Sequence, residues 1–190
     1  SGQQVPLSLS TTIAEEAGGW TATDVIDTPN GSVTQISSMD KGTLIARKVG
    51  VKQGPVSIDV SFAGNKASGN VNMSGKDTPV SVDLGGPLFA EGAGAKESIA
   101  CLPLVEGYSA TFRNFDVQKQ KVQLMQLKVT GTEKVTVPAG TFDTYKLEIT
   151  SDGDSDKETL WVAKDTHKPV KESAVLGSMG GAVLTQELMP

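Results

Sequence analysis

Short turn sequences recur at regular intervals through the first half of the chain, and they constrain the fold more than any other feature. They follow one another about every 11 residues, at Asn30-Gly31, Asp40-Lys41-Gly42, Gln53-Gly54-Pro55, Gly64-Asn65-Lys66 and Gly75-Lys76-Asp77. Gly and Asn tolerate the positive φ angles that tight hairpin loops require. Because the intervening segments alternate between apolar and polar residues, the pattern predicts an antiparallel meander in which each strand pairs with the preceding one.

The strand pattern continues through most of the chain. Its clearest segment has Val56, Ile58, Val60 and Phe62 at period two, which predicts one buried and one solvated face. We expect about a dozen strands, drawn from residues 5–14, 20–28, 32–38, 42–51, 56–62, 69–73, 80–84, 108–117, 121–130, 133–137, 141–150, 158–163, 170–176 and 182–188. A change of phase predicts a β-bulge near Met125 and Gln126.

The pattern breaks in the middle of the chain. Residues 85–107 are rich in Gly and Pro, and Ala95–Leu102 can form about two helical turns with Ile99 and Leu102 on one face before Pro103. We therefore expect one domain over residues 1–190. It comprises a β-meander at 1–84, a loop and short helix at 85–107, and a second set of strands at 108–190.

Composition excludes several classes of protein. The net charge is -5 and the pI about 4.9, which argues against binding a nucleic-acid backbone. No apolar run has the roughly 18 residues that a membrane-spanning helix needs. The single cysteine, Cys101, cannot form an internal disulfide. We expect the Ser1-Gly2 start to be an expression scar or a trimmed mature end, with further sequence upstream.

No residues form a recognisable catalytic or metal-binding pattern, so we expect neither an enzyme nor a cofactor. His167 is the only histidine, and Asp165-Thr166-His167-Lys168-Pro169 is typical of a polar turn rather than of a catalytic triad. The acidic residues 152–156 suggest either a calcium loop or a charged hairpin tip, and the missing glycine and glutamate of a calcium loop favour the hairpin tip. Cys101 beside Leu102 is expected to be a small buried hydrophobe.

The remaining candidates are apolar. Seven large side chains gather around the central break and the neighbouring strand ends: Trp20, Leu88, Phe89, Leu102, Leu104, Tyr108 and Phe112. They either fill the core or line a concavity that binds a hydrophobic ligand. In the second case the glycine-rich segment 85–94 would act as a hinge.

The second half of the chain resembles a known bacterial family. The resemblance covers residues 100–190. It is carried by Leu102-Pro103-Leu104 with Gly107-Tyr108, by residues 128–133, by Val135-Thr136-Val137-Pro138-Ala139-Gly140-Thr141-Phe142-Asp143, by Thr159-Leu160-Trp161-Val162, and by a closing strand at 182–188. These segments are similar to LolA-like domains of unknown function, whose distant relatives are the periplasmic lipoprotein carrier and the outer-membrane lipoprotein receptor. In this motif Pro138-Ala139-Gly140 would form a tight turn, and Trp161 would plug the core.

The resemblance implies a mainly β fold. It would be an antiparallel half-open barrel of about 11–12 strands with one short helical segment across its concave face. We therefore expect a non-catalytic domain, periplasmic or otherwise exported, that binds a lipid, a lipoprotein or another hydrophobic ligand. The alternative is a C-terminal accessory or docking domain of a larger bacterial enzyme, with no ligand of its own.

Overall fold

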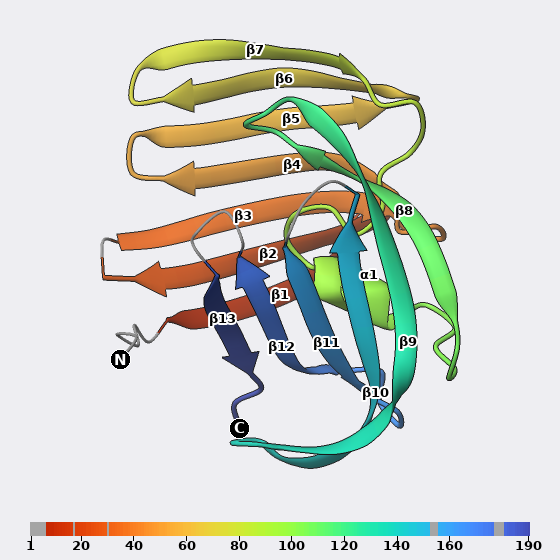
Figure 1. Ribbon diagram of the computed structural model, residues 1–190. Coiled ribbons are helices and arrows are strands. Elements are labelled where there is room, and N and C mark those ends of the chain that lie inside the picture. The colour runs from red at the N-terminus through yellow and green to blue at the C-terminus, as the bar shows by residue number, and fades with distance from the viewer. Residues whose placement is uncertain (1–6, 17, 30, 153–155, 177–180) are drawn as a thin grey trace. The chain divides into compact units, whose positions relative to one another are not determined.

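The computed structural model describes residues 7–190 except residues 17, 30, 153–155 and 177–180. Within them the chain forms one helix and thirteen strands (Figure 1). The first seven strands are β1 (Ser8–Glu16), β2 (Gly19–Thr28), β3 (Gly31–Asp40), β4 (Ala46–Gln53), β5 (Val56–Ala63), β6 (Lys66–Met73) and β7 (Lys76–Asp83). After α1 (Ala95–Ala100) come β8 (Ser109–Asp116), β9 (Lys121–Val137), β10 (Gly140–Ser151), β11 (Lys157–Ala163), β12 (Pro169–Leu176) and β13 (Ala182–Glu187).

The strands form two antiparallel sheets, and in both the spatial order follows the chain. The first runs from β1 to β7 and the second from β8 to β13, and neither closes on itself. The predicted fold class is therefore confirmed: the protein is mainly β and antiparallel, with open sheets and one short helix. By its internal contacts the chain divides into two compact units. Unit 1 comprises residues 1–95 and 114–122, and unit 2 comprises residues 96–113 and 123–190.

Unit 1 is a meander built on tight turns, as its sequence predicts. Ala63 pairs with Lys66 and Met73 with Lys76, so Gly64-Asn65 and Ser74-Gly75 are two-residue loops. Gly64, Ser74 and Gly75 all have positive φ, as such loops require. Asn30 of the predicted Asn30-Gly31 turn lies outside the described residues.

One face of the first sheet carries the core of unit 1. Strand alternation places Val49, Val60, Val71 and Val80 on this face, together with Phe62 and Leu88. Residues 84–95 cross this face, and Leu84, Leu88, Ala90 and Ala93 within them are buried. At Gly92 (φ +71°) an added Cβ would lie 2.5 Å from Ser37 Oγ, so this glycine permits the close packing of the segment on β3.

Unit 2 has its own apolar face, formed by alternate residues of neighbouring strands. Leu127 and Val129 of β9, Leu147 and Ile149 of β10, and Leu160 and Val162 of β11 are almost completely buried. Helix α1 lies against this sheet, because Lys96 forms an ion pair with Glu172 of β12 and a hydrogen bond with Gln186 of β13. The helix ends at Ala100, two residues earlier than predicted.

Three local predictions for unit 2 are wrong. Residues 121–137 form one continuous strand rather than two strands separated at Gly131. The register with β10 is unbroken at Met125 and Gln126, and it shifts instead at Thr130, between the pairs Lys146–Gly131 and Leu147–Val129. Trp161 does not plug the core: buried Leu160 and Val162 take the inner face of β11, so Trp161 between them points to the other face.

Candidate functional site

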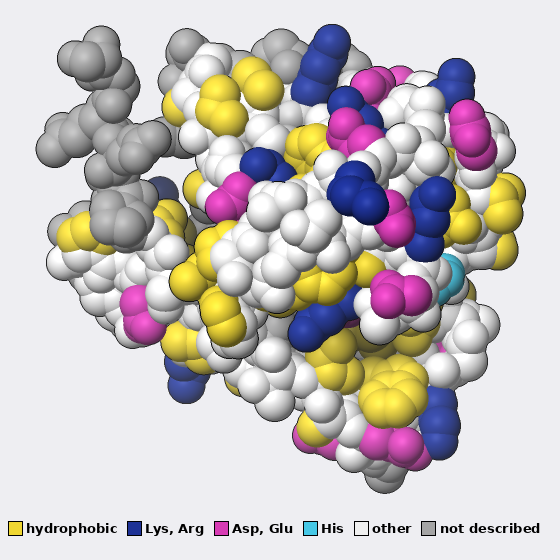
Figure 2. Space-filling model, turned by 90° about the horizontal axis from the view of Figure 1, so that it is seen from below, with side chains coloured by type: hydrophobic (Ala, Val, Ile, Leu, Met, Phe, Trp, Pro, Cys, Tyr) yellow, Lys and Arg dark blue, Asp and Glu magenta, His cyan; other side chains and the backbone are white. Residues whose placement is uncertain are grey.

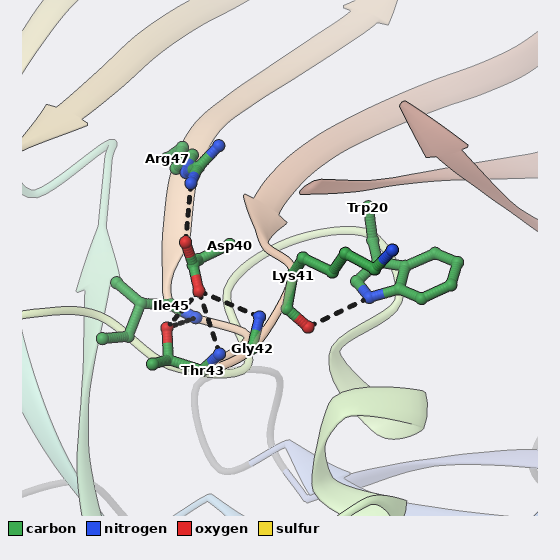
Figure 3. A network of polar contacts seen from close by, with 7 residues as sticks. All are labelled: Trp20, Asp40, Lys41, Gly42, Thr43, Ile45 and Arg47. Atoms are coloured by element: carbon green, nitrogen blue, oxygen red, sulfur yellow. Dashed lines mark hydrogen bonds and ion pairs between the residues drawn. The ribbon is translucent and has the colours of Figure 1, made fainter. Parts of the chain in front are cut away.

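The turn between β3 and β4 in unit 1 is organised by the carboxylate of Asp40 (Figure 3). Its Oδ1 accepts hydrogen bonds from the backbone amides of Gly42 and Thr43 and from the Thr43 hydroxyl, each at 3.0 Å. Its Oδ2 accepts one from the Arg47 guanidinium at 2.6 Å. These donors, with the Thr43 amide foremost, lower the pKa of Asp40 to about 2, so the turn is held by an ionised carboxylate at neutral pH.

Trp20 is attached to the same turn. Its indole Nε1 donates a hydrogen bond to the carbonyl of Lys41 at 3.3 Å, and the Lys41 ammonium lies 6.0 Å from the ring centroid (Figure 3). Lys41 also forms an ion pair with Glu15 of β1. The turn is thereby fixed to β1 and β2.

A cleft of about 210 Å³ opens beside this turn. Asp40, Thr43 and Arg47 form its polar side. Its apolar side is formed by six residues from the end of this turn, from β4 and β5, and from the segment after β7: Ile45, Ala46, Phe62, Leu84, Pro87 and Leu88. Ala46, Leu84 and Leu88 are themselves buried in the core, so the apolar wall is part of the folded interior and exists before any ligand arrives.

A buried carboxyl group lies in the same unit. Glu91 is 9% exposed, and its Oε2 accepts a hydrogen bond from the Phe115 amide at 2.8 Å. Burial raises the pKa of Glu91 to about 7; the charge of Asp116 acts in the same direction, and the Phe115 amide opposes it. Nearby, Asn114 donates a hydrogen bond to the carbonyl of Ala90. These two bonds fasten residues 114–122 to the segment that crosses the first sheet.

Unit 2 has a polar cluster on its apolar face. The Lys96 ammonium lies 3.0 Å from the Glu172 carboxylate, and the two side chains are only 20% and 14% exposed. Half-buried Glu158 of β11 lies near this pair. Burial raises the pKa of Glu158 to about 7; the Glu172 charge adds to this and the Lys96 charge opposes it.

The seven apolar candidates are divided between the units. Trp20, Leu88 and Phe89 belong to unit 1, where Leu88 is core and lines the cleft, and Phe89 forms a β-bridge with Ile45. The other four belong to unit 2: Leu102, Leu104, Tyr108 and Phe112. Leu104 is buried there and the other three are half-buried.

The single cysteine and the single histidine of the chain both lie on the surface of unit 2. Cys101 is exposed, contrary to the prediction of a buried thiol, because α1 ends at Ala100 and the buried positions are taken by Ile99 and Ala100. His167 lies in the exposed turn between β11 and β12, and its ring Nδ1 is 2.7 Å from the carbonyl of Ala100. Residues 153–155 of the acidic loop lie outside the described residues. Among those described, no group of three or more His, Cys, Asp or Glu side chains could hold a metal ion.

Sequence reasoning missed the charged residues that the fold brings together. Lys96, Glu158 and Glu172 are far apart in the chain and carry no motif. One signal was available: Glu158 and Glu172 occupy inward positions in strands whose other inward residues are apolar, such as Leu160 and Val170. On the face shown in Figure 2, basic and acidic side chains are interspersed with hydrophobic ones and form no continuous field of one sign.

Comparison with known proteins assigns the chain to a family. Residues 11–185 match the model of a family described as "Protein of unknown function (DUF3108)", and the chain belongs to that family. No curated protein and no solved structure matches the chain significantly. Within the described residues, no helix combines the length and the hydropathy needed to cross a membrane.

Proposed function

We propose that this chain is a non-catalytic binding domain that holds an apolar group of its ligand in the cleft of unit 1. The observation that carries the proposal is the wall of that cleft, formed by the core residues Ala46, Leu84 and Leu88. Apolar surface removed from water on binding contributes about 25 cal/mol per Å². A preformed wall also avoids the free-energy cost of ordering side chains when the ligand arrives.

The size of the cleft limits what it can hold. An enclosed apolar cavity of roughly 150 Å³ accepts a benzene molecule, and pockets for drug-sized ligands span roughly 300–1,000 Å³. At about 210 Å³ this cleft accommodates a ring or a short hydrocarbon segment. A larger ligand such as a lipid would insert one end of its apolar part and leave the rest outside.

The polar side of the cleft gives the site a fixed rim. Arg47 is held by Asp40, and Asp40 is held by Gly42 and Thr43, so these groups keep their positions without a ligand. A rim with paired charges beside an apolar wall suits an amphipathic molecule whose polar end stays in water.

The resemblance of residues 100–190 to LolA-like domains extends the proposal. It supports an exported, periplasmic protein whose ligand is a lipid or a lipidated partner. Fractionation of bacterial cells that express the full-length gene tests this location, because an exported protein should be released with the periplasmic contents.

Native mass spectrometry tests the ligand. Protein purified from a bacterial host should carry added mass that corresponds to a hydrophobic molecule. Pro87 is exposed and lines the cleft, so Pro87→Glu places a charge against the apolar wall without removing a core side chain. We expect the variant to lose the added mass and to bind an apolar fluorescent probe about tenfold more weakly.

Pro55→Glu is the matched control, because Pro55 is an exposed proline of the same unit that lies in the turn between β4 and β5. It should behave as the unsubstituted protein does. Equal probe binding by both variants, with no added mass in the unsubstituted protein, would contradict ligand binding in this cleft.

The alternative function is a docking domain of a larger bacterial enzyme, with no ligand of its own. One observation favours it: Val175 and Val183 face each other across β12 and β13 and are 38% and 62% exposed. An exposed apolar pair is suited to contact with a partner. A photo-crosslinking residue at position 183 should then capture one defined protein, and one at exposed Ser10 should not.

A further inference from the structure

A second cleft, of about 200 Å³, lies on unit 2 and combines apolar walls with a carboxylate. Its apolar lining comprises Met125 of β9, Ile149 of β10, and Ala174 and Val175 of β12. Gln123, Ser151, Asp156, Lys157 and Glu158 complete it. None of these residues belongs to the cleft of unit 1, so the two sites are separate.

Strand pairing places the carboxylate of Glu158 among the apolar residues. Glu158 pairs with Ile149 of β10 on one side and with Ala174 of β12 on the other. Residues that pair directly across antiparallel strands project from the same face of the sheet. Lys157, the preceding residue, projects from the opposite face.

The cation whose charge acts on Glu158 is already engaged. The Lys96 ammonium contacts the Glu172 carboxylate at 3.0 Å and also donates a hydrogen bond to Gln186. No residue in the described part of the chain donates a hydrogen bond to Glu158, which interacts with Lys96 and Glu172 only through their charges. The half-buried Glu158 carboxylate therefore borders the cleft with its hydrogen-bonding capacity unused.

The charges that act on Glu158 leave its carboxylate without a contacting cation. They are the Glu172 carboxylate, which disfavours a second negative charge, and the Lys96 ammonium, which contacts Glu172 at 3.0 Å. Partly buried charge is unfavourable unless it is paired. A positive charge brought into the cleft beside Glu158 would pair its ionised carboxylate.

We propose that this cleft binds a primary ammonium group carried on an apolar stem. The ammonium would donate hydrogen bonds to Glu158, and the stem would lie against Met125, Ile149 and Ala174. Charge-assisted hydrogen bonds of this kind are shorter and stronger than neutral ones. The chemistry is shared by a free aliphatic amine and by the side chain of a lysine on a partner protein.

Binding should depend on pH in a defined direction. The pKa of Glu158 is raised to about 7, so its ionised fraction rises roughly tenfold between pH 6 and pH 8, while an alkylammonium with a pKa of roughly 10.4 stays protonated. Affinity should therefore increase by roughly that factor. A bound cation also favours the carboxylate, so binding near pH 7 should release protons.

Titration with n-butylammonium chloride, followed by the amide resonances of Ile149 and Ala174, tests the proposal. We expect saturable binding to the unsubstituted protein at pH 8, at least about tenfold weaker in Glu158→Gln. Glu148→Gln is the matched control, because Glu148 is exposed on the same hairpin and its loss changes the net charge equally. It should bind as the unsubstituted protein does.

Two further ligands complete the experiment. 1-Butanol has the same stem without the charge and should not saturate the cleft. Nα-acetyl-lysine N-methylamide distinguishes the sources: tighter binding than butylammonium indicates a protein lysine, and weaker binding indicates a free amine. Absence of saturable binding, equal loss in both variants, or equal binding of 1-butanol would overturn the proposal.

Discussion

Glu91 and Glu158, one in each unit, have a raised carboxyl pKa because each has lost much of its contact with water. Glu91 is held by the Phe115 amide, and Glu158 borders a cleft beside an engaged lysine. Glutamate is among the residues least often buried, so sequence reasoning places such residues on the surface unless a partner can be identified. Their partners come from distant parts of the chain, and the burial becomes apparent only in the folded protein.

The free energy of unfolding should depend on pH through Glu91. Its pKa is about 7 in the folded protein and 4.5 as the reference value, so the folded state binds the proton more tightly. The stability that this proton contributes is complete below about pH 4.5 and is lost as pH rises through about 7. Glu91→Gln has no such proton to lose. Relative to the unsubstituted protein, the free energy of unfolding of the variant should therefore be higher at pH 8 than at pH 5, by up to about 3 kcal/mol.

Urea unfolding at pH 5 and pH 8, followed by Trp20 fluorescence in a Trp161→Phe background, measures the effect in unit 1. Glu16→Gln serves as the control, because Glu16 is an exposed carboxylate of the same unit. If Glu91→Gln and Glu16→Gln change stability with pH in the same way, Glu91 does not have the raised pKa described here.

At the scale of elements, β11 shows how strand alternation assigns neighbouring residues to different environments. Leu160 is fully buried, whereas Trp161 lies on the other face. The indole Nε1 donates a hydrogen bond to Glu133, and the ammonium groups of Lys146 and Lys171 lie 5.7 and 5.9 Å from the ring centroid. A large aromatic residue in an apolar strand suggests a core position, but the parity of the strand decides which face it occupies.

Alanine substitutions at these two adjacent positions should therefore differ in cost. Leu160→Ala leaves a cavity in the core and should reduce the free energy of unfolding by about 2–5 kcal/mol. Trp161→Ala removes contacts on the half-exposed face and should cost about 1–2 kcal/mol. Urea denaturation of the two variants measures both values. A cost for Trp161→Ala equal to that of Leu160→Ala would contradict the outward placement of the indole.

The turns were predictable because their chemistry is local. Gly64-Asn65 and Gly75 satisfy the backbone requirements of their loops wherever the rest of the chain lies. Gly131 was misread as a turn because a glycine in a strand pattern indicates either a turn or a bulge. The pairing of β9 with β10, which includes the bulge at Thr130, decides between the two.

At the scale of the whole molecule, sequence reasoning anticipated two sets of strands but not the composition of the compact units. Residues 114–122 belong to unit 1, although they follow α1 and the first part of β8, which belong to unit 2. The chain thus passes between the units three times. The candidate site is likewise only partly predictable: Leu88 can be chosen by its hydrophobicity, whereas Asp40 and Arg47 become neighbours of the cleft only through the fold.

Truncation tests this division of the chain. A fragment of residues 1–95 lacks Phe115, Val117 and Val122, which pack against the core of unit 1, and it removes the amide that binds Glu91. We expect it to unfold without a cooperative transition, whereas residues 1–122 should retain one. Thermal denaturation followed by circular dichroism compares them. A cooperative transition in the shorter fragment would show that residues 114–122 are dispensable for unit 1.

The exposed thiol of Cys101, one residue beyond α1, is a site at which the protein can be labelled with a fluorescent dye. The chain contains one cysteine, so a maleimide dye would attach at a single place without any engineered substitution. Trp20 and Trp161, one in each unit, could then serve in turn as energy-transfer donors to that dye. Replacing each tryptophan separately would yield two variants, each with one donor and the same acceptor. The distance between donor and dye could then be measured in each variant in solution while a ligand binds.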